Sequence, residues 1–227
     1  MNARGLKLRP VPVALGEPPD DELVARAREG NAAAFEKLMR RYNQRVFRAA
    51  RSILQNDAEA EDVVQETFVR AYRHLGDFAG RASVATWLTR IAVHEAFARV
   101  RRARRFGGDE DDFSRARSTQ AGPEEQVSSR ELRSVLVAAI DSLQESLRTV
   151  FVLRDVEGLS TLETCEVLEL TPEAVRVRLH RARAALRLHI EKQVGVEVGS
   201  VFGFAAERCD RTVAAVFRRL ELPLPTS

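Results

Sequence analysis

The chain is poor in the residues that build disulfide scaffolds, metal centres and sheets. Only two of its 227 residues are cysteines, Cys165 and Cys209, without a CxxC pair and without histidines at zinc spacing. We therefore expect no structural zinc site, no other metal site and no disulfide framework. Aromatic residues make up 6% of the chain. Strand-like alternation is confined to a short stretch from Val194 to Val198, so no sheet is predicted.

Long apolar runs are absent as well. No stretch of about 18 apolar residues marks a membrane span, and the N-terminus lacks an apolar segment of signal-peptide length, which predicts a cytoplasmic protein. The sequence also lacks a P-loop, a metal-binding His/Cys set and a constellation of catalytic carboxylates. We therefore expect no catalytic residues, no cofactor and no small-molecule substrate.

Helix-forming residues are abundant, and apolar residues recur among them at helical spacing. We predict an all-α fold of two small helical domains, joined by a flexible linker and followed by a C-terminal amphipathic helix. The predicted parts are a proline-rich disordered leader (1–19), a first domain (20–105), a linker with two basic and six acidic residues (106–126), a second domain (127–192) and an extension (193–227).

The first domain is expected to contain four helices. Asp20 or Asp21 is predicted to cap the first, and a long apolar stripe from Phe35 to Leu54 marks the second. The third, between residues 57 and 76, is expected to be acidic on its outer face and to turn an apolar set inward, namely Val64, Phe68, Ala71, Tyr72 and Leu75. A loop over 77–83 precedes the fourth, which begins at Val84 and ends in five arginines within 99–105. Trp87 is interpreted as part of its core face.

Residues 159–188 have the pattern of a helix-turn-helix. A short helix is followed by a turn over 169–171, and Thr171 with Pro172 supplies the cap and first position of a second helix. Between residues 171 and 192, six bases face two acids, which suits a recognition helix in a major groove. Inner faces are predicted from the apolar spacing: Leu132, Val135, Leu136, Ala139, Ile140 and Leu143 on an earlier helix, Leu162, Cys165, Val167 and Leu168 on the short helix, and Val175, Leu179, Ala182 and Leu186 on the second.

Four segments together resemble a bacterial RNA polymerase sigma factor of the extracytoplasmic-function (ECF) group. They are DAEAEDVVQETFVRAYRHL (57–75), FAGRASVATWLTRIAVHEAFARVRR (78–102), LRDVEGLS (153–160) and TPEAVRVRLHRARAALR (171–187), in the family's order. The resemblance implies that residues 20–105 are sigma domain 2 and residues 127–192 sigma domain 4. It also implies three partners, which are core RNA polymerase, promoter DNA in duplex and single-stranded form, and a cognate anti-sigma protein.

The resemblance assigns roles in the first domain. The acidic helix is expected to dock on core polymerase through Asp62, Gln65 and Glu66, although residue chemistry alone favours an ordinary acidic surface. The loop and helix after it are expected to recognise and help melt the minus-ten element, with arginines on phosphates and an aromatic ring stacking a released base. The candidates are Phe78, Arg81, Thr86, Arg90, His94, Arg101 and Arg102. His94 stands where many members carry asparagine, so the preferred base stays open.

In the second domain, the resemblance places the second helix at the minus-thirty-five element. Arg176 and Arg181 are expected to pair with guanine edges, and Val177 and His180 to make apolar or single hydrogen-bond contacts. His180 fits a half-buried position equally well. Thr171, Arg178 and Arg183 are expected to hold phosphates.

Two further interpretations concern function. The alternative is a stand-alone helix-turn-helix regulator that binds duplex operators as a dimer and needs no polymerase. The second basic surface, over residues 78–105, favours the sigma factor. The C-terminal extension carries an amphipathic stripe, from Ala206 through Cys209 to Leu220, that predicts a helix packed on the second domain or on a partner.

Overall fold

The computed structural model describes residues 18–106 and 127–194, and these contain helices and turns without a strand, which confirms the all-α prediction. The predicted linker, most of the predicted leader and the predicted C-terminal helix lie outside the described residues. The described residues up to Leu186 belong to one compact unit.

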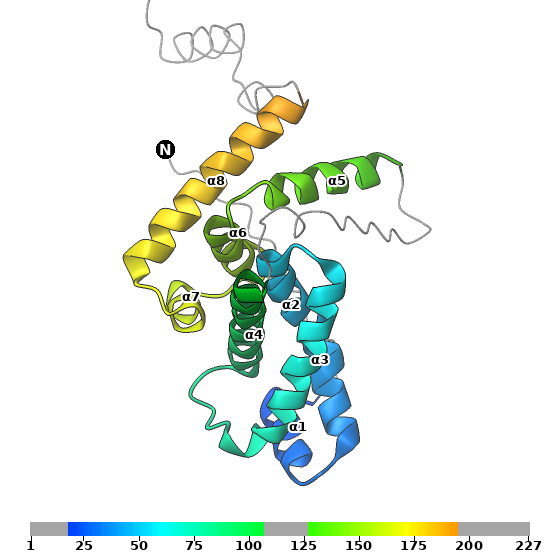
Figure 1. Cartoon of the computed structure of the whole chain (residues 1–227). Coiled ribbons are helices and arrows are strands. Elements are labelled where there is room, and N and C mark those ends of the chain that lie inside the picture. The colour runs from blue at the N-terminus through cyan, green and yellow to red at the C-terminus, as the bar shows by residue number, and fades with distance from the viewer. Residues whose placement is uncertain (1–17, 107–126, 195–227) are drawn as a thin grey trace, which may run out of the picture. The chain divides into compact units, whose positions relative to one another are not determined.

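The first part of that unit is a bundle of four helices: α1 (Asp20–Arg28), α2 (Ala32–Leu54), α3 (Asp57–Arg73) and α4 (Val84–Phe106). Helices α2, α3 and α4 lie side by side (Figure 1). The chain reverses where the sequence offers caps, because the side chains of Asn31 and Asn56 accept hydrogen bonds from the first turns of α2 and α3. A short 3-10 turn, η1 (Leu75–Asp77), follows α3 and leads into the loop before α4.

The second part contains α5 (Val127–Asp141), α6 (Glu145–Phe151), a π-helical turn η2 (Val152–Val156), α7 (Thr161–Leu168) and α8 (Pro172–Val194). It joins the first part through apolar and charged residues. Leu153, Leu159 and Val167 belong to the same buried cluster as the core of α1–α4. Arg148 of α6 is buried and donates from Nε to the carbonyl of Ser52 on α2 (2.6 Å) and from Nη1 to the carbonyl of Leu143 (2.6 Å). Burial lowers the pKa of Arg148, against Asp141 and Glu145, which raise it.

Three arginines of α2 extend this charged contact. The carboxylate of Glu157, after η2, is 3% exposed and lies 2.5 Å from Arg48 Nε and 3.3 Å from Arg45 Nε. Arg51 donates to both carboxylate oxygens of Asp141, at 3.0 and 2.8 Å. Because the three arginines recur every third residue, one face of α2 receives the acidic groups of the second part.

Several predicted positions are wrong. Tyr72 is half exposed and packs edge-on against Phe35 (5.0 Å between ring centroids), because Val63 and Thr67 occupy the inner face of α3. Asp20 does not cap α1, since Pro19 holds that position and the Asp20 carboxylate accepts hydrogen bonds from Arg41 and Tyr42.

Two leucines predicted to face inward are exposed. Leu136 of α5 is 42% exposed and Leu162 of α7 is 74% exposed, whereas Ala139 and Val167 on the same helices are buried. Trp87 is half-buried and packs against the core of the first part, with its ring on Phe78. Helical spacing located these stripes but not the residues at their edges.

A pair of leucine substitutions tests this core. Leu88, on α4, is 2% exposed, so Leu88→Ala leaves a cavity and should lower the free energy of unfolding by about 2–5 kcal/mol. The exposed Leu162 is the matched control, and Leu162→Ala should change the free energy of unfolding by less than about 0.5 kcal/mol. Urea denaturation followed by circular dichroism measures both, and equal losses would contradict the packing.

Candidate nucleic-acid interface

The helix-turn-helix is built by local hydrogen bonds that its sequence supplies. A capping box begins α7, in which the Ser160 hydroxyl accepts from the Glu163 N–H (3.1 Å) while Glu163 Oε2 accepts from the Ser160 N–H (2.8 Å). Glu169 ends α7 in the left-handed region (φ 54°). Thr171 then caps α8 by accepting from the N–H of Ala174 (3.2 Å), as predicted.

The predicted division of α8 into two faces is confirmed. Its apolar residues Val175, Leu179, Ala182 and Leu186 are all buried. Most of the residues predicted to contact the minus-thirty-five element are exposed on the remaining surface, and only Arg178 is half-buried. The exposed ones are Thr171, Arg176, Val177, His180, Arg181 and Arg183. For His180, the structure supports the exposed position over the half-buried one.

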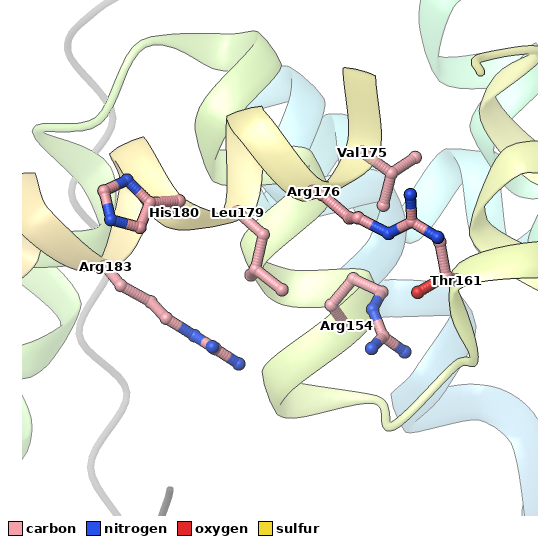
Figure 2. A pocket seen from close by; sticks show the side chains of 7 residues that line it. All are labelled: Arg154, Thr161, Val175, Arg176, Leu179, His180 and Arg183. Carbon is pink, nitrogen blue, oxygen red and sulfur yellow. The ribbon is translucent and has the colours of Figure 1, made fainter. Parts of the chain in front are cut away.

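A cavity of about 260 Å³ lies beside this face (Figure 2). Side chains from α8, from η2 and from the first residue of α7 line it, and four of them carry cationic or imidazole groups. These are Arg154, Arg176, His180 and Arg183. Because three of these groups are guanidiniums, the lining of the cavity is cationic and can attract an anion such as a phosphate.

Arg154 was not predicted from the sequence. It lies in η2, and one of its terminal nitrogens donates to the carbonyl of Leu159. Its Nε is buried without a hydrogen-bond partner among the described residues. The sequence signal was weak, because a lone arginine before an aspartate is an ordinary surface pattern, and only the fold brings it to α8.

Arg183 lines the same cavity and is held in place by Asp155. Its Nε and Nη2 donate to the two carboxylate oxygens of Asp155, at 2.8 and 2.7 Å, and this hydrogen bonding raises the pKa of Arg183. The pairing orients the guanidinium, and its remaining donors are available to an anion.

The predicted minus-ten residues are less uniformly accessible. Arg81, His94, Arg101 and Arg102 are exposed and Arg90 is half-buried. Phe78 is half-buried, and its ring lies 4.9 Å from that of Trp87, measured between centroids. Arg28 donates to the carbonyls of Leu75 (3.0 Å) and Phe78, which anchors the start of the loop.

Thr86 is the exception among these residues, because it is only 1% exposed. Its hydroxyl donates to Glu163 Oε1 of α7 (2.8 Å) and pairs with the Ser83 hydroxyl at 2.8 Å. In this arrangement, the side chain proposed to meet DNA is covered by the helix-turn-helix.

The predicted polymerase-binding residues lie on the outer side of α3. Asp62 and Gln65 are exposed, and Glu66 accepts a hydrogen bond from Arg70 (2.7 Å). That bond lowers the pKa of Glu66, so its carboxylate stays ionised. Nη1 of Arg99, on α4, lies 3.5 Å from Oδ2 of Asp62. The outer side of α3 therefore presents one amide and two carboxylates, and each carboxylate has an arginine partner within the chain.

The described residues contain no group of three or more His, Cys, Asp or Glu side chains placed to hold a metal ion. Nor does any helix among them have the length and apolarity needed to cross a membrane. The features that stand out are the cationic face of α8, the arginine-bearing helix α4 and the acidic face of α3.

Comparisons with known proteins agree with these features. Residues 38–106 match the family Sigma-70 region 2, and residues 133–186 match Sigma-70, region 4. The chain is similar to the ECF RNA polymerase sigma-E factor of Escherichia coli strain K12, with 35% identity over 74% of this chain and 92% of that protein. It is 34% identical to the RNA polymerase sigma-H factor of Pseudomonas aeruginosa, over 74% of this chain and 91% of that protein.

Solved structures show the same likeness. CnrH, determined in complex with the cytosolic domain of CnrY, is 31% identical, with a TM-score of 0.55 over 76% of this chain and 97% of that one. RpoE of Bartonella quintana, determined with the anti-sigma factor NepR, shares the fold at 22% identity, with a TM-score of 0.57 over 69% of this chain and 96% of that one.

Identity at this level across both matched regions, in the family's order, decides against a stand-alone regulator. The chain belongs to the ECF group of RNA polymerase sigma factors, which are transcription initiation factors.

Proposed function

We propose that this sigma factor reads its promoters with two surfaces, α8 on the duplex minus-thirty-five element and α4 with its preceding loop on the minus-ten element. The observation that carries the proposal is the exposed cationic face of α8 beside the cavity of Arg154, Arg176 and Arg183. A helix with buried apolar residues on one side and arginines on the other can enter a major groove without losing its own packing.

On α8, we assign some residues to base edges and others to phosphates according to their side chains. Arg176 and Arg181 are long enough for bidentate pairing with guanine, and Val177 and His180 lie between them for shorter contacts. Arg178, Arg183 and Thr171 are assigned to phosphates, since Arg183 is already oriented by Asp155. We add Arg154 to this phosphate-binding set because it lines the same cavity.

On α4, the proposed contacts follow the helix. Arg90 and His94, with Arg81 in the loop, are assigned to the backbone and edges of the melted strand, and Phe78 to stacking on a released base. Arg101 and Arg102, both exposed, are assigned to phosphates. Thr86 joins this set once its surface is uncovered.

The acidic first half of α3 is assigned to core polymerase. Asp62, Gln65 and Glu66 are on its outer side, and they suit a basic or polar partner surface. Polymerase supplies the catalysis, so we assign no enzymatic activity to the chain itself and place it in the cytoplasm, with the polymerase and DNA. The solved complexes of CnrH and of RpoE with second proteins support a cognate anti-sigma partner for this chain.

Substitution of one base-reading residue tests the α8 assignment. Arg176→Ala should lower specific run-off transcription by about 5- to 150-fold, because one bidentate base contact contributes about 1–3 kcal/mol. The assay uses purified core polymerase and a promoter library from the source genome. Arg40→Ala, which removes an exposed arginine of α2, is the control and should leave transcript levels within about twofold. Equal effects of the two would refute the assignment.

The α4 assignment predicts a difference between closed and opened promoters. Arg90→Ala should reduce transcription from duplex promoters by about tenfold, because a charged contact to the melted strand is lost. Templates with a pre-melted minus-ten region should recover most of the loss, since strand separation is then supplied. Lys37→Ala, at an exposed cation of α2, is the control. Normal opening by Arg90→Ala on duplex DNA would exclude this role.

Charge reversal tests the docking surface on α3. Asp62→Lys with Glu66→Lys should weaken core polymerase binding by about tenfold, because both charges would face the partner with the wrong sign. Fluorescence competition for labelled core polymerase measures the affinity. Glu29→Lys with Glu36→Lys makes the same charge change on exposed residues of the α1–α2 region and should have little effect. Similar losses in both pairs would indicate net charge rather than a docking site.

A further inference from the structure

One apolar side chain interrupts the cationic face of α8. Val177 is 49% exposed, and Arg176, His180 and Arg181 are exposed beside it in the sequence and one turn further along the helix. Val175, two residues earlier, is completely buried. The helix therefore keeps one valine in the core and presents the other to whatever binds its outer face.

Helix geometry places Val177 in the middle of that outer face. At roughly 100° per residue, its side chain is turned about 200° from that of Val175, which belongs to the buried stripe. The same count turns Arg176 about 100° and Arg181 about 240° from Val175, so the two arginines flank the valine. In a major groove, the side chain opposite the buried stripe lies deepest, next to the base edges.

Neither packing nor helix propensity accounts for a valine at this position. Half of the side chain is exposed, so it gains less from burial than Val175 does. A β-branched residue is also less favourable in a helix than alanine, arginine or lysine. Its stiffness is useful for binding, however, because a valine in a helix has one strongly preferred χ1 rotamer and loses little freedom when it meets a partner.

The major groove presents one apolar group to such a side chain, which is the C5 methyl of thymine. The other major-groove groups that distinguish the base pairs are hydrogen-bond donors and acceptors, and cytosine has no methyl. Valine neither donates nor accepts a hydrogen bond through its side chain. Placed against a polar base edge, Val177 would displace water and leave that edge without a partner, which is unfavourable.

We propose that Val177 reads the methyl group of a thymine in the minus-thirty-five element, at or next to the base pair that Arg176 contacts. The inference rests on the proposed minus-thirty-five role of α8. Neighbouring residues of a helix are separated by about 1.5 Å along its axis, less than the roughly 3.4 Å between base pairs. The element is therefore expected to have a thymine within one base pair of the guanine that Arg176 reads.

Removal of the methyl group alone tests this contact. Each thymine of a minus-thirty-five element selected in the run-off assay is replaced in turn by deoxyuridine, which keeps the hydrogen-bonding groups of thymine. Anisotropy of fluorescein-labelled promoter DNA measures binding by the complex of the full chain with core polymerase. One replacement, within one base pair of the guanine whose preference Arg176→Ala relaxes, should weaken binding about fourfold, because one buried methyl group is lost.

Val177→Ser removes the apolar groups from the protein side. Serine and valine have similar helix propensities, so α8 should keep its helicity by circular dichroism. The variant should bind the thymine and deoxyuridine promoters within about twofold of each other, because the methyl no longer has a partner. The control is Val137→Ser, at a 45% exposed valine of α5, and it should keep the fourfold difference.

A gain of binding is expected from the reverse change. When the thymine is replaced by cytosine, 5-methylcytosine at the same position should bind the unchanged protein about fourfold more tightly than cytosine does, since it restores only the methyl. Val177→Ser should show no such gain.

The contact is refuted if no deoxyuridine replacement weakens binding, if the element has no thymine within one base pair of that guanine, or if the difference persists in Val177→Ser. These results leave the role of α8 standing, because Arg176→Ala in the run-off assay tests that role by itself. If Arg176→Ala leaves transcription unchanged, the minus-thirty-five role of α8 and the thymine contact are both overturned.

Discussion

The buried pairing of charged groups between α2 and the segment before the helix-turn-helix determines how the two parts of this protein meet. Arg148 and Glu157 are both almost fully buried, and each is compensated by partners on or near α2. Burying an ion costs several kcal/mol unless hydrogen bonds offset it. In this protein, the hydrogen bonds offset that cost only while the two parts are in contact. When the parts separate, water can hydrogen-bond to the same charged groups. Leu153, Leu159 and Val167 add an apolar contact beside these charged groups, because they belong to the same buried cluster as the first part.

The two proposed DNA surfaces are not equally accessible while the two parts are together. The face of α8 depends on its own apolar stripe, so its arginines are exposed while the parts are together. The face of α4 is the one that loses access, since Thr86 is buried and its neighbours face glutamates. The difference arises because only the proposed surface of α4 is covered by another part of the chain.

Features set by nearby residues could be predicted from the sequence. The cap at Thr171, the turn at Glu169 and the buried stripe of α8 depend on residues a few positions apart, and all were predicted. The prediction failed where a distant segment decides the environment. Thr86 is buried by a helix 77 positions later in the chain, and Arg154 reaches α8 only because η2 folds back beside it.

The residues at the edges of the apolar stripes were also predicted incorrectly, and these errors have one cause. Leu162 has helical spacing relative to Cys165, yet it is exposed because the inner face of α7 is narrow and Thr164 and Val167 fill it. Periodicity fixes the direction of a face but not its width, which depends on how closely the neighbouring helices approach. For the same reason, Tyr72 is on the surface while Val63 and Thr67 are inside.

Two glutamates of α7 and the glutamate at its C-cap are difficult to explain by promoter binding alone. In a helix-turn-helix, the first helix crosses the DNA backbone, where carboxylates would meet phosphates and weaken binding. Glu163, Glu166 and Glu169 instead face α4, so one helix can offer its remaining surface to the duplex and its acidic side to the first part of the chain. The Glu163 carboxylate serves the start of α7 and the contact with α4 at once. Burial opposes its ionisation, but the hydrogen bonds of Ser160, followed by that of Thr86 and the charge of Arg45, lower the pKa of Glu163.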